Sequence, residues 1–354
     1  MTDLSPTTRP VAPQHAFDVE RFAAWLRATV QPSAAEVQVA QFKGGQSNPT
    51  YLITAGQTRY VLRRKPPGKL LPSAHAVERE YRVISALAGS DVPVPRTFAL
   101  CEDETVIGTA FYLMDYVAGR VFWDPQLPGM NPAERRAIHE EINRVIAALH
   151  SVDPVAVGLG DFGKTGEYIS RQVARWSKQY VASETEKIEA MDNLIAWLPD
   201  NIPAGGETRI VHGDYRIDNV IFHPTEPRVV AVLDWELSTL GHPLADFAYH
   251  CMVWRIPPGV FRGLAGADFT GLGIPTEREY LDLYCRRTGR ASIPERDWQY
   301  YIAYNLFRIA AIAQGVMARA LQGNASSAEA MQTGRAARPL AELAWSQVER
   351  LKKS

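Results

Sequence analysis

The sequence predicts an α+β protein in two lobes, a small β-rich lobe followed by a larger, mainly helical one. Three observations predict it: strand-like runs crowd residues 36–118, long stretches with helical spacing fill most of the later chain, and a short apolar island at 208–234 interrupts those helices. A chain of 354 residues is long for one core and suits two lobes. We expect a flexible tail over 1–16, an N-terminal lobe over 17–117 and a C-terminal lobe over 118–354.

The small lobe is expected to contain five antiparallel strands with one inserted helix. A helical pattern begins near Phe17, ahead of the strands. Strand-like runs, separated by turn-forming residues, then cover residues 36–42, 50–55, 59–64, 92–101 and 110–119. The inserted helix lies between the third and fourth runs, at 73–89, with Ser73 as its candidate N-cap.

The larger lobe begins with a long amphipathic helix over 131–152, and two further helical stretches follow within 165–198. After the apolar island, residues 242–350 show helical spacing again. A loop rich in Gly and Pro interrupts this region, and we expect its residues 257–275 to close over a substrate.

Composition excludes several classes of protein. The chain is 46% hydrophobic, and its 38 Lys and Arg nearly balance 39 Asp and Glu, so bulk attraction to nucleic acid is not expected. Cys101, Cys251 and Cys285 form no CxxC pair, which favours a reducing compartment. The polar, proline-rich start is not a signal peptide, and no apolar run reaches membrane-spanning length. We therefore expect a cytoplasmic protein that binds neither nucleic acid nor membrane.

A carboxylate on an apolar helix face points to a buried ion pair. Glu80 shares its face of the predicted helix with Val77 and Ile84, and an unpaired buried carboxylate would cost several kcal/mol. Arg63 or Lys65, which share one face of their strand, could supply the partner. The pair would fix a cation beneath the preceding loop, or would simply tie helix to sheet.

That preceding loop has a composition suited to phosphate. Its residues are Gly44, Gly45, Gln46, Ser47 and Asn48. Glycines let backbone N–H groups approach a ligand closely, while Ser and Asn favour turns. The loop is therefore either a phosphate cradle or an ordinary hairpin tip.

Three polar side chains fall at the ends of apolar strands in "VHGDYRIDNVIFHP" and "VVAVLDWE". Asn219 lies five residues after Asp214 and begins one apolar run, and Asp234 ends the apolar run that follows. An amide oxygen and a carboxylate suit Mg²⁺, which takes its other ligands from phosphate and water. Asp214 would then be available to accept a proton. Capping of loops by these side chains is the alternative, which explains any one of them better than all three.

These residues resemble the aminoglycoside phosphotransferase-like kinases, relatives of the protein-kinase fold. Their catalytic loop H-x-D-x-x-x-x-N is present as "HGDYRIDN", and their Asp-aromatic pair as "LDW". The resemblance covers residues 36 to about 325 and implies a protein-kinase-like two-lobed fold. It also implies a phosphotransferase that uses ATP and Mg²⁺, although ATP and GTP are not distinguished.

The resemblance assigns roles to the catalytic residues. Asp214 would orient and deprotonate the substrate hydroxyl, while Asn219 and Asp234 would hold Mg²⁺ on the nucleotide. His212 and Asp246 would brace the catalytic loop. The pair Asp234-Trp235 is followed by Glu rather than Gly, so a kinase-style activation flip is not expected.

The resemblance also assigns the nucleotide-binding residues. The loop from Gly44 to Asn48 would cover the phosphates, and Glu80 would pair with Arg63 beneath it. Arg63 stands where the family usually has Lys or Arg, and the sequence does not decide whether Arg63 or Lys65 contacts phosphate. The adenine slot would be lined by Met114, Asp115 and Tyr116.

The acceptor is the least determined part of the function. Residues 255–354 carry 14 Lys and Arg against 9 Asp and Glu, which favours an anionic acceptor. The stretch "YVLRRKPPGKLLPSAHAVEREYRV" is similar to the kinase-like domain that some proteins carry fused to an acyl-CoA dehydrogenase. That similarity implies a hydroxyacyl-CoA or hydroxy acid as acceptor. An aminoglycoside is the second possibility, and choline or homoserine the third. A non-catalytic nucleotide-binding scaffold is an alternative from another class.

Overall fold

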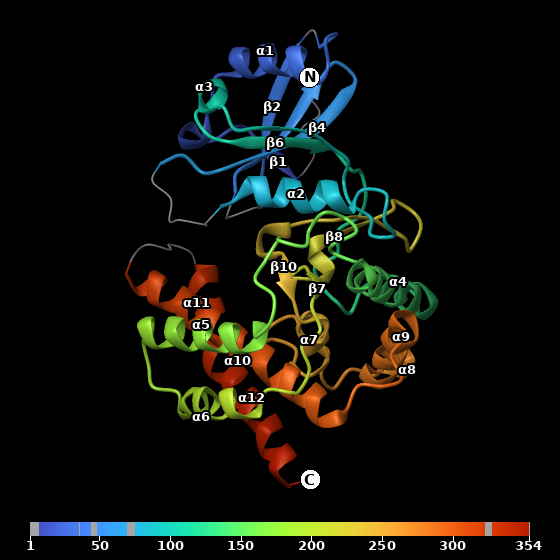
Figure 1. Cartoon of the computed structure of the whole chain (residues 1–354), viewed down its shortest axis with the longest axis vertical. Coiled ribbons are helices and arrows are strands. Elements are labelled where there is room, and N and C mark those ends of the chain that lie inside the picture. Colours follow the sequence, from blue (N-terminus) through green and yellow to red (C-terminus); the bar gives the residue numbers. More distant parts are fainter. Residues whose placement is uncertain (1–6, 35, 44–47, 69–74, 323–327, 354) are drawn as a thin grey trace. The chain divides into compact units, whose positions relative to one another are not determined.

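The computed structural model describes residues 7–34, 36–43, 48–68, 75–322 and 328–353. The chain divides into two compact units (Figure 1). The first contains Met1–Arg120 together with the short segments Ile221–Pro224 and Val230–Ser238, and the second contains the remainder. The sequence alone assigns both short segments to the second lobe, because they lie beyond residue 117.

An antiparallel sheet forms the centre of the first unit (Figure 1). In the described part of the chain it has six strands in the order β1-β2-β3-β4-β6-β5. Their bounds are β1 Thr8–Arg9, β2 Val37–Phe42, β3 Thr50–Ala55, β4 Thr58–Arg64, β5 Thr97–Cys101 and β6 Phe111–Asp115.

The expectation of five strands is corrected by β1. This strand lies in the segment expected to be a flexible tail, where Thr8 pairs with Phe42 and Arg9 with Gln41. Just beyond it, the backbone N–H of Ala12 donates to Gln41 Oε1 at 3.1 Å. A two-residue strand shows no alternation that could be recognised, so only its pairing with β2 reveals it.

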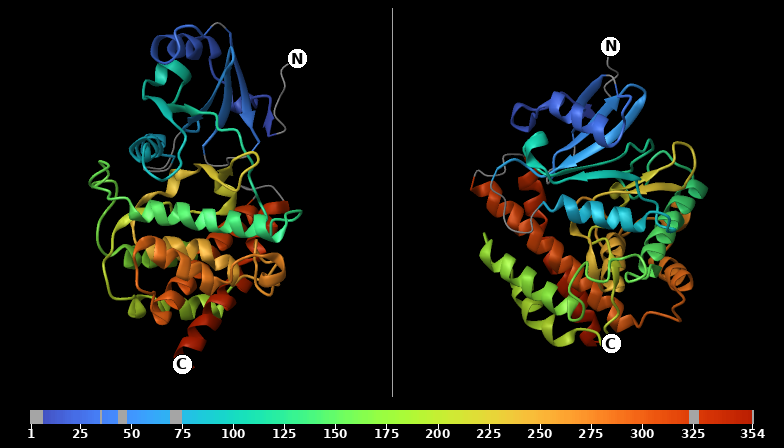
Figure 2. Two further views of the ribbon diagram at one scale, coloured as in Figure 1. Left: turned by 90° about the vertical axis from the view of Figure 1, so that its right-hand side faces the viewer. Right: turned by 45° about the horizontal axis from the view of Figure 1, so that its top comes forward.

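Helices of the first unit are α1 Val19–Thr29, α2 Val77–Leu87 and α3 Glu104–Ile107, with 3-10 turns η1 Pro13–His15 and η4 Trp235–Leu237. Helix α1 begins after Asp18, whose carboxylate accepts from the Arg21 backbone N–H at 3.0 Å. Phe22 and Leu26 of α1 pack with Tyr51, Leu62 and others into one apolar cluster. Figure 2 shows this unit from two further directions.

The N-cap expected at Ser73 lies outside the described residues, and α2 begins at Val77. Helix α3 has four residues, too few for a helical period to appear in the sequence.

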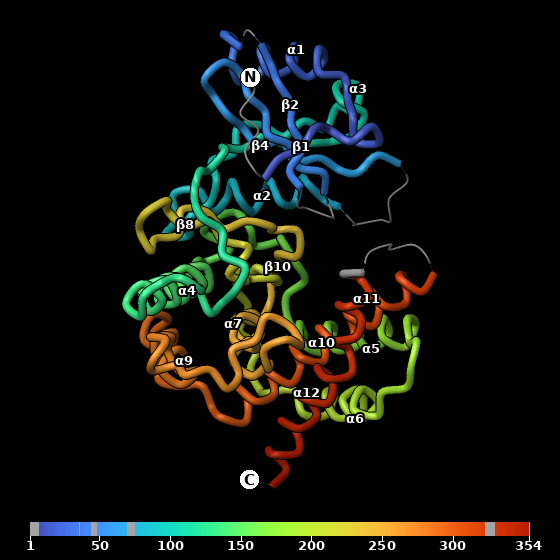
Figure 3. The backbone as a smooth tube through the Cα atoms, turned by 180° about the vertical axis from the view of Figure 1, so that it is seen from behind, coloured from blue at the N-terminus to red at the C-terminus, as the bar shows by residue number. Residues whose placement is uncertain are grey.

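Long helices make up most of the second unit. Their bounds are α4 Pro132–Ser151, α5 Tyr168–Ala182, α6 Glu189–Trp197, α7 Pro243–Cys251, α8 Phe269–Leu272, α9 Glu277–Thr288, α10 Glu295–Leu321, α11 Ala328–Arg335 and α12 Ala337–Lys353. Asn131 and Glu134 form a capping box at the start of α4. Helix α10 packs against α5, α7, α11 and α12, as Figure 3 shows from behind, and so forms the centre of this unit.

Short strands and 3-10 turns occupy the predicted apolar island and the segments on either side of it. They are β7 Arg209–Val211, β8 Val220–Phe222, β9 Val229–Val232 and β10 Thr239–Gly241, with η2 Pro199–Asn201, η3 Ile217–Asn219 and η5 Met252–Trp254. Strand β8 pairs with β9, and β7 pairs with β10. The sequence does not reveal β10, because its three residues gain extended structure only by pairing with β7.

Cys101, Cys251 and Cys285 are buried free thiols, as expected. Among the helices that the structure describes, none combines the length and the apolar character that crossing a bilayer requires.

Candidate active site

Asp246 holds the backbone of the predicted catalytic loop. Strand β7 leads into His212-Gly213-Asp214, and Asp246 lies on α7, which packs against β7. One carboxylate oxygen accepts the His212 backbone N–H at 2.8 Å, and the other accepts that of Gly213 at 2.8 Å. Although burial raises the pKa of Asp246, hydrogen bonds and charge from His150 and His212 outweigh it and lower that pKa. The predicted brace therefore acts on the main chain of the loop.

The side chain of His212 has a separate contact within the loop. Its ring is fully buried, and Nδ1 accepts the backbone N–H of Asp214 at 3.2 Å. Gly213, between them, has a φ of +83°, which a residue with a Cβ rarely adopts. These two features stabilise the tight turn of the loop.

Donors approach both carboxylate oxygens of Asp214. The hydroxyl of Tyr249, from α7, donates to Oδ1, and Asn219 Nδ2 donates to Oδ2 at 3.1 Å. Arg216 Nε lies 3.2 Å from Oδ1. The side chain of Asp214 is 18% exposed, so the carboxylate is fixed in orientation and still accessible to a small molecule. Such a group can orient a hydroxyl and accept its proton.

Two residues that the sequence argument did not assign to the site also hold the loop. Arg308, on α10, donates from Nη2 to the carbonyl oxygen of Gly213 at 2.7 Å, and its guanidinium lies 4.8 Å from the centre of the Tyr249 ring. Burial raises the pKa of Tyr249, and the charge of Asp214 adds to this, so the hydroxyl stays a donor. Arg308 stands within an apolar run of α10, and a charged residue at such a position is a signal that could have identified it.

In the first unit, the predicted ion pair joins β4 to α2. Arg63 Nε lies 2.7 Å from Glu80 Oε2, and the Glu80 side chain is 1% exposed. Asn48 Nδ2 donates to Glu80 Oε1 at 2.7 Å, and the Tyr112 hydroxyl donates to Oε2 at 3.1 Å. Lys65 pairs instead with Glu78 at 2.9 Å. The prediction that Arg63 or Lys65 pairs with Glu80 is confirmed for Arg63.

Asp234 belongs to the same unit and also contacts Arg63. Its Oδ1 lies 2.7 Å from Arg63 Nη2, while Glu236 Oε2 lies 3.8 Å from the same nitrogen. Burial alone would lower the pKa of Arg63, but Glu80 and the neighbouring carboxylates raise it overall. Asp234 has a φ of +65°, a left-handed conformation that Asp tolerates better than most residues. Strained backbone of this kind is often found at functional sites.

The other predicted nucleotide-binding residues are only partly described. Gly44, Gly45, Gln46 and Ser47 lie outside the described residues. Met114 and Asp115 end β6, where Met114 pairs with Val61 of β4. Burial raises the pKa of Asp115, and Arg96 opposes it. The ring of Tyr116 lies 4.3 Å from the Arg59 guanidinium. An adenine slot at these residues stays a prediction.

Comparison with known proteins identifies the family. The sequence profile of the phosphotransferase enzyme family matches residues 38–284. The chain belongs to this phosphotransferase family.

Two similar proteins add detail. Mouse acyl-CoA dehydrogenase family member 10 is 50% identical over 344 residues, which are 96% of this chain and 32% of that protein. The chain spans less than half the length of the curated relatives it matches. The crystal structure of a Ralstonia eutropha protein, provisionally named an aminoglycoside phosphotransferase, has a TM-score of 0.88 and 57% identity. It covers 95% of this chain and 99% of that one.

A more distant neighbour shows the kinase-like fold alone. It is an aminoglycoside phosphotransferase solved with AMP-PNP and hygromycin B, with a TM-score of 0.57 and 17% identity. The match covers 92% of this chain and 98% of that one. The predicted fold class is thereby confirmed, with six strands in place of five.

The two residues predicted to hold magnesium lie in different units, Asn219 in the second and Asp234 in the first. Asn219 donates from Nδ2 to Asp214, so its amide oxygen points away from that residue. The Asp234 side chain is 34% exposed, although one oxygen contacts Arg63. Within the described residues no three His, Cys, Asp or Glu side chains cluster as a metal site. Amide and carboxylate oxygens are both ligands that Mg²⁺ accepts, so each side chain suits its predicted role, and the joint magnesium site stays a prediction.

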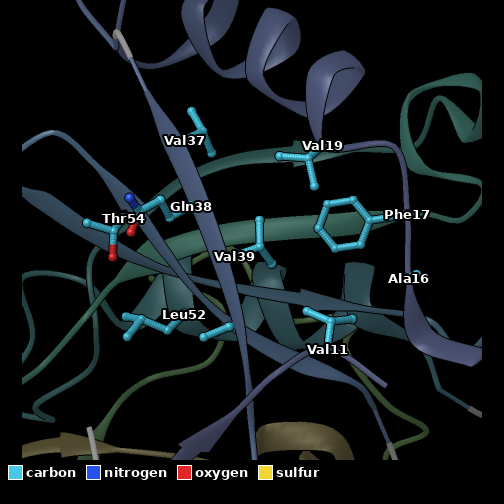
Figure 4. Close-up of a pocket in the computed structure, with 10 residues that line it drawn as sticks. Val11, Ala16, Phe17, Val19, Val37, Gln38, Val39, Leu52 and Thr54 are labelled. Carbon is cyan, nitrogen blue, oxygen red and sulfur yellow. The ribbon is translucent and has the colours of Figure 1, made fainter. Parts of the chain in front are cut away.

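The first unit of the phosphotransferase also contains a cavity that differs from a phosphate site. It measures about 430 Å³ and is lined mainly by apolar side chains, among them Phe17, Val37, Val39 and Leu52 (Figure 4). None of the residues predicted to bind nucleotide or metal lines it. The lining of this cavity therefore does not support phosphate binding.

Proposed function

We propose that the chain transfers the γ-phosphoryl group of ATP to a hydroxyl of a small anionic molecule, with a hydroxyacyl-CoA or a related hydroxy acid as the acceptor. The observation that carries this proposal is the environment of Asp214. Its carboxylate is oriented by Tyr249, Arg216 and Asn219 and is still partly exposed. A fixed, accessible carboxylate is what alignment of an attacking hydroxyl requires.

Each residue has a distinct part in the proposed reaction. Asp214 orients the acceptor hydroxyl and takes its proton as the oxygen attacks the γ-phosphorus, while the bond from that phosphorus to the bridging oxygen breaks and ADP leaves. Asn219 and Asp234 would hold Mg²⁺, which when bound neutralises charge on the phosphate oxygens. Arg63, held by Glu80, would supply a further positive charge to the phosphates. The chain contributes alignment and electrostatics, and no covalent intermediate on the protein is needed.

Nucleotide would bind to the remaining predicted residues. The loop Gly44 to Asn48 would cover the phosphates, and Met114, Asp115 and Tyr116 would line the adenine slot. The choice of ATP is supported by the AMP-PNP bound to the distant neighbour. The same assay with GTP in place of ATP tests whether GTP also serves as the phosphoryl donor.

Two observations favour an anionic acceptor. Residues 255–354 carry five more positive than negative charges. The similar curated proteins are named as acyl-CoA dehydrogenase family members, which supports an acyl-CoA derivative. An aminoglycoside kinase is the second candidate, supported by the provisional name of the Ralstonia protein. The positive surplus argues against it, because aminoglycosides are polycations.

The test is ADP release from Mg·ATP with a panel of hydroxyacyl-CoAs, hydroxy acids, aminoglycosides, choline and homoserine. Asp214→Asn is the control, and removal of this base should lower kcat by roughly 10²- to 10⁴-fold. Turnover of an anionic acceptor that the control loses supports the proposal. Turnover of aminoglycosides alone would replace the acceptor. Tight Mg·ATP binding without turnover of any acceptor would favour a non-catalytic scaffold.

A further inference from the structure

Two arginines are joined through one buried carboxylate of the catalytic loop. Asp218 has a side chain that is only 5% exposed. Its Oδ2 accepts from Arg262 Nη1 and lies 3.5 Å from Arg216 Nη2. The side chains of Arg216 and Arg262 are 26% and 37% exposed. Arg262 is the more exposed of the two arginines, whereas Arg216 also contacts Asp214, so the charges of the two arginines and the two carboxylates balance.

An exposed aromatic ring extends this cluster. The Arg262 guanidinium lies 5.1 Å from the centre of the Trp123 ring, and Trp123 is 62% exposed. An indole with that much of its surface in water gives little to the stability of the fold, since its apolar area stays hydrated. Exposed Trp and Arg side chains that contact each other are typical of ligand-binding surfaces.

A small cavity lies next to the two arginines. It measures about 30 Å³, and its lining includes Arg216 and Arg262 with the apolar side chains Ile142, Val253, Trp254 and Phe261. A volume of this size holds little more than one water molecule or a methyl group. The cavity thus suits a short apolar branch of a ligand whose charged group meets the arginines.

We propose that Arg262, Arg216 and Trp123 form the recognition site for the acceptor, and that they bind a negatively charged group, carboxylate or phosphate, on a molecule with an apolar chain. The inference rests on the proposed function. Arg216 also contacts Asp214, so the cluster leads directly to the carboxylate that faces the reacting hydroxyl. The apolar chain packs on Trp123 and in the small cavity.

A purely structural role for Arg262 makes a different prediction. The Arg262–Asp218 pair joins the 257–275 segment to the catalytic loop, and loss of that tie would disturb every acceptor equally. Loss of an anion-binding group affects only acceptors that carry the anion. The ratio between charged and uncharged acceptors therefore separates the two roles.

The experiment compares Arg262→Gln and Trp123→Ala with wild type in the full chain. Arg338→Gln is the matched control, because Arg338 is a similarly exposed arginine that pairs with Glu186 and lines no part of the cavity. Arg262→Lys keeps the charge and should retain part of the selectivity.

Four kinds of acceptor are assayed. They are short hydroxy acids, the uncharged amides of the same acids, their CoA thioesters and their uncharged pantetheine thioesters. A carboxylate-binding site loses free acids selectively in Arg262→Gln. A phosphate-binding site loses CoA thioesters and leaves pantetheine thioesters unchanged. The two sources of the anion are thereby distinguished.

We expect Arg262→Gln to raise KM for the anionic acceptor roughly fivefold, with KM for uncharged acceptors and for ATP within about twofold of wild type. Trp123→Ala should weaken the binding of longer apolar chains more than short ones. An equal effect on charged and uncharged acceptors, or no effect, overturns the inference. If wild type turns over no acceptor, the proposed function fails. In that case, calorimetry of the same compounds with wild type and with Arg262→Gln still tests whether Arg262 binds the anionic group.

Discussion

Replacing Asp246 with Asn tests how the catalytic loop is held. The substitution keeps the size of the side chain and removes its charge. One oxygen remains to accept a backbone N–H, but the new amide nitrogen must face either the N–H of His212 or that of Gly213. Two donors then meet at a buried position, since Asp246 is 5% exposed.

The magnitude follows from the contacts that are lost. A hydrogen bond to a charged group contributes about 1.5–3 kcal/mol, and a buried donor without a partner costs about 1–3 kcal/mol. His150, whose Nε2 lies 3.2 Å from Asp246, also loses a charged partner. We expect the free energy of unfolding to fall by roughly 2–4 kcal/mol. The loosened loop should also lower kcat, with a smaller change in KM for ATP.

Urea unfolding followed by tryptophan fluorescence measures the change, and Asp282→Asn, an exposed carboxylate on α9, is the control. Surface changes of this kind stay within about 0.5 kcal/mol. Because the pKa of Asp246 is lowered on folding, its contribution is full at neutral pH and is lost as the pH falls below about 4, through the lowered value. An Asn variant as stable as the control at pH 7.5 would refute the reasoning.

Two further predictions concern buried rings. Tyr249→Phe removes the donor to Asp214 and should lower kcat roughly tenfold, whereas Tyr300→Phe, which loses a buried hydroxyl bonded to the Leu198 carbonyl, should leave kcat unchanged. Steady-state kinetics of both variants decide, and equal kcat values for them would contradict the assigned role. Burial lowers the pKa of His139 to about 4 and that of His250 to about 3, so the unfolded chain takes up protons below about pH 6.5 that the folded chain does not. The free energy of unfolding should therefore fall by about 1.4 kcal/mol for each histidine between pH 7.5 and 5.5, and His139→Gln should reduce that slope; an unchanged slope in urea unfolding would exclude His139 as a source.

Much of the fold could be predicted from local pattern. The runs at β3 and β4 alternate or carry β-branched residues, and α4 has a capping box with a long apolar stripe, so short-range physics specifies them. Strands β1 and β10 have two and three residues and carry no such pattern. Their extended structure comes from hydrogen bonds to β2 and β7, which are distant in sequence.

For the candidate site, the sequence by itself determined which residues carry the predicted chemistry. It supplied Asp214, Asn219 and Asp234 at strand ends, and the carboxylate Glu80 on an apolar face that had to find a cation. Residue type and spacing carry that information, because they fix which donors and acceptors lie near one another along the chain.

Only the tertiary structure decided which side chains hold those groups. It selected Arg63 over Lys65 for Glu80, brought Tyr249 and Arg308 from two helices onto the catalytic loop, and set Arg262 against Asp218. Every one of these contacts joins residues more than 15 positions apart. These contacts depend on how helices and strands that are distant in the sequence pack together. The residues close to either partner in the sequence therefore do not predict them.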